Sequence, residues 1–420
     1  MKKLLKIAAP LAAALAVASC SSGGSSNVPA AGVPAGTHAA VPTGQSVVVG
    51  QQLVSPHLRQ LWGGNVAPAC GAPRFDGTPQ CLALVRTDIP ARMTPLVSGL
   101  GPADIQSAYN LPSAQKGNGQ IVAIVDAFDN PNVASDLATY RQQFGLPPAN
   151  FKKFNQYGEQ GNYPPGDTGW GVEIDLDVEA VSAACPKCTI YLIESGGDLD
   201  VAEKEAVTLG AHIVSNSWIS YGCPSCDDPS AFAAPGVVYL AGSGDIGYGS
   251  PGTPMALANV VAVGGTTLHK GGGGKRGWTE TAWDGSGSGC ATGVAKPSWQ
   301  HDPNCTYRMT ADVAADADPS GGSGFAEYDT YGYGGWFVEG GTSLATPLLA
   351  GVYALAGDAA SQNAGQAFWQ KTAKTRHLYV VKSGNNGSCS PSYFCTDGTH
   401  EYKSYGGPDG WGTPHGLGAF

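Results

Sequence analysis

Apolar runs bounded by turn residues recur along the chain after Gly99. Five of them are rich in β-branched residues and cover residues 120–125, 189–193, 212–214, 236–240 and 260–263. Runs of this length and composition are typical of strands buried on both faces. Helix-like stretches lie between the first four runs, at residues 134–144, 172–184 and 199–209. This alternation predicts an α/β fold with a mostly parallel central sheet and helices on both of its faces.

The carboxyl ends of the predicted strands are the expected place for chemistry, because ligands bind at that edge of a parallel sheet. Asp126, Glu194, Ser217 and Asp245 each fall at or just after the end of a predicted strand. The sequence therefore predicts that polar side chains from four strands gather at one edge.

The N-terminus has the pattern of an export signal. Three lysines precede a short apolar stretch, residues 7–18, and small residues come before Cys20. The stretch is too short to span a membrane, so we interpret residues 1–19 as a signal peptide. Val17-Ala18-Ser19-Cys20 is similar to a bacterial lipobox, in which Cys20 becomes the lipidated first residue of the mature protein; ordinary signal cleavage near the same place is the alternative. We expect a location in the bacterial cell envelope or outside the cell, with membrane contact only through this lipid anchor.

Composition agrees with export and limits the partners. Only 13% of the residues are charged, and the formal charge of −10 becomes −13 once the three lysines of the signal peptide are removed. An acidic chain without basic clusters argues against a nucleic-acid partner. No later stretch reaches the roughly 18 apolar residues of a transmembrane helix. We expect a monomer in which residues 20–98 form a Gly/Ser/Pro-rich tether and an N-terminal extension, and residues 99–420 form the main domain.

The cysteines also fit an exported protein. Cys20 aside, the remaining ten fall into sequence-neighbouring pairs that we expect to form disulfides: Cys70/Cys81, Cys185/Cys188, Cys223/Cys226, Cys290/Cys305 and Cys389/Cys395. The two Cys-x-x-Cys units, at 185–188 and 223–226, also supply the four ligands of a tetrahedral zinc site. Their separation is longer than usual for such a site and an oxidising compartment favours disulfides, so zinc is the lesser alternative.

One segment has the features of a nucleophile turn: Gly340-Gly341-Thr342-Ser343-Leu344-Ala345-Thr346-Pro347, followed by an apolar helical run to Ala356. The glycines allow a tight turn, and we expect Pro347 to be tolerated because the first helical turn needs few donors. Ser343 would lie where the helix dipole and free N–H groups favour developing negative charge. A simple Thr/Ser N-cap is the alternative, and these residues alone do not decide between the two.

A serine nucleophile needs a base, and the usual base is histidine. None of the eight histidines stands in a Gly-rich His-Gly-Thr-type helix start. Glu173 and Asp177 are four residues apart on one face of a predicted helix, where one carboxyl can orient the other through a shared proton and at least one pKa is raised. Asp175 and Glu179 repeat the spacing on another side, so a solvated acidic face is the alternative.

Asp245 ends the segment Leu240-Ala241-Gly242-Ser243-Gly244-Asp245, which follows a predicted strand. A Gly-Asp pair at that place is often only a turn. An aspartic acid kept protonated by its surroundings can instead donate a hydrogen bond to a substrate oxyanion. A glutamate base and a neutral aspartic acid donor would both work best in acid.

Together, the Glu-x-x-x-Asp of Glu173 and Asp177, the Ser-Gly-Asp of Asp245 and the Gly-Thr-Ser of Ser343 resemble the sedolisins, or serine-carboxyl peptidases. The likeness runs from about residue 100 to residue 420, with the motifs in the family's order. It implies a subtilisin-like fold and hydrolysis of polypeptide substrates at acidic pH, by an endopeptidase or a tripeptidyl-peptidase. Ser343 would be the nucleophile, Glu173 the base, Asp177 its partner and Asp245 the oxyanion donor. By analogy with that fold, strand ends would line the substrate cleft at Ser215, Asn216, Ser217, Trp218, Ser243 and Gly244.

Two departures from the family's pattern stand out. Val380-Val381 and Pro408-Asp409-Gly410-Trp411-Gly412 occupy the places where sedolisins carry the carboxylates of a calcium site. Backbone carbonyls alone would hold a hard cation weakly, so we expect no calcium and no other cofactor. The second departure is the short stretch before the catalytic region, which puts activation by removal of a large inhibitory domain in doubt. Residues 45–98 are either an extension wrapped on the main domain or a remnant pro-segment.

Two other functions are compatible with parts of the sequence. A subtilisin-type peptidase would use Asp126 as the triad aspartate and Asn216 as the oxyanion donor, but it lacks a recognisable histidine. A cell-surface binding lipoprotein would keep the fold without turnover, but all four matched residues are present.

Overall fold

The structure is a computed structural model, which describes residues 56–93, 97–249, 251–362, 365–370, 376–398 and 404–420. The predicted signal peptide, Cys20 and the tether up to residue 55 lie outside the described residues. All of the described residues belong to one compact unit, residues 46–420. Their helices include none with the length and apolar character needed to cross a membrane.

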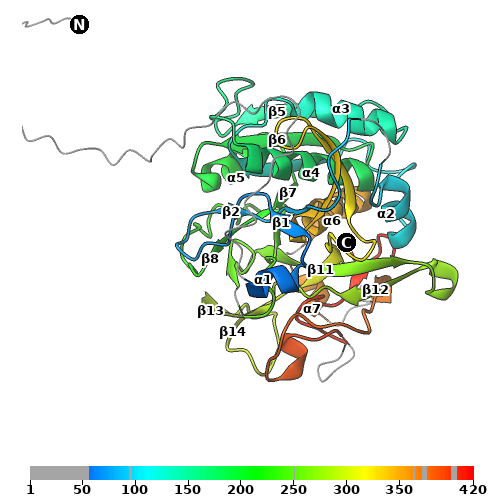
Figure 1. Ribbon diagram of the computed structural model, residues 1–420. Coiled ribbons are helices and arrows are strands. Elements are labelled where there is room, and N and C mark those ends of the chain that lie inside the picture. Colours follow the sequence, from blue (N-terminus) through cyan, green and yellow to red (C-terminus); the bar gives the residue numbers. More distant parts are fainter. Residues whose placement is uncertain (1–55, 94–96, 250, 363–364, 371–375, 399–403) are drawn as a thin grey trace, which may run out of the picture. The chain divides into compact units, whose positions relative to one another are not determined.

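A mostly parallel sheet forms the centre of this unit (Figure 1). Its strand order is β12-β11-β9-β7-β4-β6-β5, with β15 pairing to β11. All neighbours are parallel except β11 and β12. The strands are β4 Ile121–Ala127, β5 Asn150–Asn155, β6 Thr189–Ser195, β7 Ile213–Asn216, β9 Val238–Gly242, β11 Val260–Lys270, β12 Trp278–Ala282 and β15 Val313–Asp316. The predicted parallel α/β sheet is therefore confirmed.

Two buried helices, α4 and α6, pack against each other and against this sheet. Helix α4 spans Thr168–Ala184. Asp167 is its N-cap, and the carboxylate of this residue accepts the N–H groups of Gly169 and Trp170 in the first turn. Helix α6 spans Thr342–Ala356. They approach so closely that a β-carbon on Gly351 would lie 2.7 Å from the β-carbon of Ala184. The other helices are α1 Pro56–Leu61, α2 Pro102–Tyr109, α3 Val133–Gln143, α5 Leu199–Thr208 and α7 Gln366–Trp369.

Two smaller sheets join the N-terminal extension to the rest of the unit. The first has the order β1-β3-β17-β16 and the second has the order β10-β8-β2. In Figure 1, β2 of the extension is drawn beside β8. Their strands are β1 Val66–Pro68, β2 Gln80–Cys81, β3 Leu84–Arg86, β8 Trp218–Tyr221, β10 Gly252–Thr253, β16 Phe325–Asp329 and β17 Gly335–Gly340. Two further pairs are β13 Gly289–Ala295 with β14 Tyr307–Thr310, and β18 Leu378–Tyr379 with β19 Thr413–Pro414.

Five disulfides join the cysteines in the neighbouring pairs that their spacing predicts: Cys70–Cys81, Cys185–Cys188, Cys223–Cys226, Cys290–Cys305 and Cys389–Cys395. In both Cys-x-x-Cys units the two sulfurs are bonded to each other. They therefore have no free thiolates for zinc, and the zinc alternative is wrong for this structure.

Candidate active site

Ser343 lies in the first turn of α6, directly after strand β17. Gly341 makes the turn between the two elements at φ +109°, a backbone conformation that favours glycine. Our explanation for Pro347 is wrong, because this residue lies in the second helical turn rather than the first. Its missing N–H leaves the carbonyl of Ser343 without a helical donor. The Ser217 hydroxyl lies 3.3 Å from that carbonyl, but its one proton is shared with the closer Asp177 Oδ1, at 2.7 Å.

Glu173 receives the nucleophile's hydrogen bond. The Ser343 hydroxyl donates to Glu173 Oε2 at 2.8 Å, and both side chains are fully buried. Glu173 extends from α4 and Ser343 from α6, so the packing of the two helices places the base on the nucleophile. The N–H groups of Leu82 and Ala83 donate to the same carboxylate oxygen, each at 2.8 Å.

Three buried carboxyls gather beside the nucleophile. Burial is the main cause that raises the pKa of Glu173 and that of Asp177, and the charge of Asp126 is the next cause for both. Burial also raises the pKa of Asp126 itself, to about 8. Asp177 Oδ1 accepts the Ser217 hydroxyl at 2.7 Å, whereas Asp177 Oδ2 and Glu173 Oε1 have no hydrogen-bond partner. The charge of Glu173 is a further cause that raises the pKa of Asp177, and the hydrogen bond from Ser217 fixes the position of Asp177.

The alternative of a solvated acidic face on this helix is wrong. Asp175 and Glu179 are as fully buried as Glu173 and Asp177. Asp175 accepts the side-chain amide of Asn130 at 2.6 Å, and Glu179 accepts the N–H of Tyr328. Burial raises the pKa of both carboxyls. The whole acidic stretch of α4 therefore lies inside the protein.

Asp245 follows strand β9 and faces the start of α6. Its Oδ1 accepts the N–H and the hydroxyl of Thr342, at 2.9 and 2.8 Å. Its Oδ2 has no hydrogen-bond partner and lies close to Gly341. Burial raises the pKa of Asp245 to about 7, against the lowering effect of the Thr342 bonds. In acid, a proton on Oδ2 can therefore be donated to an oxygen beside Gly341.

The predicted substrate-binding residues divide into two groups. The backbone of Ser217 and of Trp218 faces the extension, since the Ser217 carbonyl accepts the Leu82 N–H at 3.2 Å and Trp218 pairs with Cys81. The side chains of Ser215 and Ser243 are buried without hydrogen-bond partners, the Asn216 amide donates to Leu240 O, and the Gly244 N–H donates to the Thr342 hydroxyl. One N–H of the Asn216 amide is therefore used within the sheet, which does not favour this residue as the oxyanion donor of a subtilisin-type site.

Sequence reasoning missed several contacts of the site. Thr342 holds Asp245, and the Trp62 ring N–H donates to the Asp245 carbonyl at 2.6 Å. The Tyr221 hydroxyl accepts the Asp245 N–H at 3.1 Å. Of these residues, only Thr342 could have been proposed from the sequence, because it stands next to Ser343. The contact of Trp62 spans 183 positions and could not be read from spacing.

The C-terminal segment, in which we expect no calcium site, offers few carboxylate oxygens among its described residues. Val380 and Val381 bring no side-chain oxygen. Asp409 is buried, its Oδ1 has no hydrogen-bond partner, and burial followed by the charge of Asp397 raises its pKa. Calcium takes about six to eight oxygen ligands. Within the described part of this segment, two neighbouring carboxyls of like charge do not by themselves supply that number.

Another carboxylate group has the spacing of a metal site. Ligand atoms of Asp136, Asp175 and Asp329 lie within 4.8 Å of one another. However, three backbone N–H groups of residues 331–333 donate to Asp329, and Thr330 donates to Asp136. Donors directed at these oxygens would oppose a cation, so we interpret the cluster as hydrogen-bonded carboxyls.

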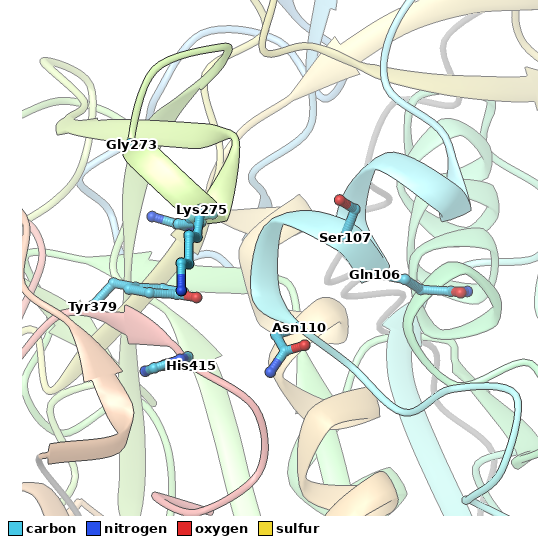
Figure 2. A pocket seen from close by; sticks show the side chains of 8 residues that line it. Gln106, Ser107, Asn110, Gly273, Lys275, Tyr379 and His415 are labelled. Atoms are coloured by element: carbon cyan, nitrogen blue, oxygen red, sulfur yellow. The ribbon is translucent and has the colours of Figure 1, made fainter.

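A separate polar pocket lies between the end of α2, the β11–β12 turn and the C-terminal segment. Figure 2 shows Gln106, Ser107 and Asn110 on one side of it, with Lys275, Tyr379 and His415 on the other. The Arg276 guanidinium lies over the Tyr379 ring, 3.8 Å from its centroid, and is paired with Glu280. None of the four proposed catalytic residues lines this pocket.

Comparison with known proteins agrees with this geometry. A model of the subtilase family matches residues 168–401, more than half of the chain. The chain belongs to the subtilase family. Its relatives place it in the sedolisin branch of that family: it is 28% identical to sedolisin of Pseudomonas sp. (strain 101) over 75% of this chain, and 31% identical to kumamolisin of Bacillus sp. (strain MN-32) over 60%.

The structure of this chain is also similar to a solved structure of the sedolisin family. Pseudomonas sedolisin, a serine-carboxyl proteinase solved with two molecules of pseudo-iodotyrostatin, superimposes with a TM-score of 0.64 at 25% identity. The match covers 76% of this chain and 96% of that one. The subtilisin-like fold is therefore confirmed. The chain spans only 60% and 51% of the full lengths of the two sequence relatives.

Proposed function

We propose that this protein is an exported serine-carboxyl peptidase that hydrolyses peptide bonds in proteins at acidic pH. The observation that carries the proposal is the 2.8 Å hydrogen bond from Ser343 Oγ to Glu173 Oε2, at the buried junction of α4 and α6. A hydroxyl that donates to a carboxylate at the start of a helix is arranged for nucleophilic attack. The names of its relatives, sedolisin and kumamolisin, support the same reaction class.

In the proposed mechanism, Ser343 Oγ attacks the peptide carbonyl while Glu173 takes its proton. Ser217 fixes the position of Asp177 by its hydrogen bond. The carboxyls of Asp177 and Glu173 interact through charge, and this interaction affects the pH at which Glu173 can accept the proton. Glu173 then gives the proton to the leaving amine, and water hydrolyses the ester on Ser343. The oxyanion is stabilised by Asp245 Oδ2–H and by the N–H of Ser343.

The alkaline limit of the proposed activity follows from Asp245. An ordinary aspartate ionises near pH 4, but here burial moves the pKa to about 7. Asp245 is therefore a donor below about pH 7 and a charged acceptor above it, where it would repel the oxyanion. We expect calcium to have no part in this mechanism, because the described C-terminal segment offers only two side-chain carboxyls, Asp397 and Asp409.

The test is a pH–activity profile on a denatured protein substrate, with the peptide products identified by mass spectrometry. We expect new peptides at acidic pH, activity that falls as the pH rises through about 7, and no effect of a calcium chelator. Release of tripeptides alone would indicate an exopeptidase, whereas internal cuts would indicate an endopeptidase. Activity that peaks above neutrality and disappears in acid, or no hydrolysis at any pH, would contradict the proposal.

A further inference from the structure

The polar pocket beside α2 has two unlike walls. Its volume is about 550 Å³. One wall carries Lys275 and Arg276, from the turn between β11 and β12, and His415, which follows β19. Across from them lies the C-terminal end of α2, with Ser107 and Asn110 (Figure 2). Basic side chains therefore face neutral hydrogen-bonding groups across one cavity.

Two of the basic side chains are not used inside the protein. Lys275 and His415 are both exposed, and neither side chain has an ion pair or a hydrogen bond among the described residues. The His415 ring stacks on the Tyr379 ring, with the centroids 4.3 Å apart, and this contact holds the imidazole at the pocket. In acid, a histidine side chain carries a positive charge. This wall then presents two cations without a counter-ion in the described part of the chain.

Arg276 fastens this wall to α2. Its Nε donates to the carbonyl of Ala108 at 2.9 Å, and its Nη2 donates to Glu280 at 2.7 Å. The Glu280 side chain is only 2% exposed, and it also accepts the Tyr109 hydroxyl. Glu280 is therefore satisfied inside the protein, and no carboxylate is among the described residues that line the pocket.

The wall made by α2 offers groups that can bind hydroxyls. Ser107 Oγ accepts the ring N–H of Trp278 at 3.2 Å, while its own O–H has no acceptor among the described residues. Asn110 ends the helix in the left-handed conformation, at φ +53°, and its side-chain amide has no partner in that part of the chain. The Gly416 N–H donates to the Tyr109 carbonyl, so the end of the helix is itself satisfied. One hydroxyl and one amide are thus free to bind a ligand.

We propose that this pocket binds an acidic sugar, a hydroxylated ring that carries a carboxylate or a phosphate group. The negative group lies at Lys275 and His415, because charge-assisted hydrogen bonds to such oxygens are the strongest that these side chains form. The ring hydroxyls bond to Ser107 and Asn110. A cavity of this volume has the size of sites for small organic ligands, about 300–1,000 Å³, and is larger than a bare anion needs. Polar groups on both walls favour a hydroxylated ligand over an apolar one, which would leave them unpaired.

The test is isothermal titration calorimetry of the full-length protein in acid, with glucuronate, glucose 6-phosphate, glucose and inorganic phosphate as separate titrants. We expect at least one of the two acidic sugars to bind about tenfold more tightly than glucose, which lacks the charge, and than inorganic phosphate, which lacks the ring. Whichever acidic sugar binds more tightly identifies the preferred anionic group. Hydrolysis of a denatured protein is measured in parallel.

Three variants assign the binding to this pocket. Lys275→Gln should weaken the acidic sugar by about tenfold and leave hydrolysis unchanged, because Lys275 lies outside the catalytic groups. Asn110→Gly removes the amide but keeps a backbone that glycine adopts readily, so it should bring the acidic sugar towards the affinity of inorganic phosphate. Lys152→Gln is the matched control, since Lys152 is an exposed lysine on β5, at the opposite edge of the central sheet from β12. We expect it to bind as the wild type does.

Several results would overturn the proposal. Absence of binding by all four titrants, or glucose that binds as tightly as the acidic sugars, would mean that the basic wall recognises no such ligand. Inorganic phosphate that binds as tightly as the acidic sugars would make the pocket a simple anion site and rule out the sugar. An equal loss of affinity in Lys152→Gln and Lys275→Gln would place the binding elsewhere. None of these results bears on the peptidase function, which the parallel hydrolysis tests separately.

Discussion

Ser343→Ala should lower kcat by about a millionfold, and Glu173→Gln by a similar factor, because loss of either nucleophile or base removes the same proton-coupled attack. The double variant should be no worse than either single variant, since the two groups act as a unit. The physical reason is their hydrogen bond: without the carboxylate, nothing else bonded to the Ser343 hydroxyl is a base. The measurement is the rate of peptide hydrolysis in acid.

The matched control is Ser113→Ala. Ser113 is buried to 1% exposure and its hydroxyl donates to the Ala184 carbonyl, so the change removes one buried hydroxyl away from the nucleophile. We expect this variant to retain the wild-type rate. Near-wild-type activity in Ser343→Ala or in Glu173→Gln would contradict the mechanism.

The second large effect is expected from substitution of Asp245, which we propose sets the upper pH limit of activity. In the wild type, kcat/KM should fall as the pH rises through about 7, because Asp245 loses the proton that it donates. Asp245→Asn supplies an amide donor at every pH, so its activity should persist above pH 7 where the wild type fails. Asp245→Ala should instead cost about 10²–10³ throughout, as expected for loss of an oxyanion donor.

Asp227→Asn is the control for this profile. Asp227 is another buried aspartate whose pKa is raised by burial, to about 6, but it lies in the loop after β8 and contacts none of the four catalytic residues. We expect its profile to match that of the wild type. If Asp245→Asn loses activity at the same pH as the wild type, a group other than Asp245 sets the alkaline limit.

The central strands could be predicted because they are buried on both faces. Runs such as residues 120–125 and 236–240 differ from β4 and β9 by only one or two positions at each end. Strand β5 was missed because Asn150–Asn155 contains two lysines and little apolar sequence. It is an edge strand, paired only to β6 within the central sheet, and Lys152 and Lys153 lie over the rings of Tyr191 and Tyr163. Tertiary pairing, rather than periodicity, makes this segment a strand.

The candidate site also has residues that the sequence predicts and residues that only the folded structure reveals. Glu173 and Asp177 could be proposed from their helical spacing, and Ser343 from the glycine turn before it. Leu82 and Ala83 could not, because their contact with Glu173 joins residues about 90 positions apart and uses only backbone N–H groups. The low share of charged residues also does not reveal that the structure buries several carboxyls with raised pKa values.

Loss of activity in Ser343→Ala does not by itself show which atom is acylated. The most direct test of Ser343 is therefore to trap the acyl-enzyme. Wild-type protein is mixed in acid with an activated peptide ester, quenched, and mapped by mass spectrometry. The account predicts one acyl group per chain, on the peptide that contains Ser343. Turnover of the ester with the acyl group on another residue, or with none on Ser343, would contradict it.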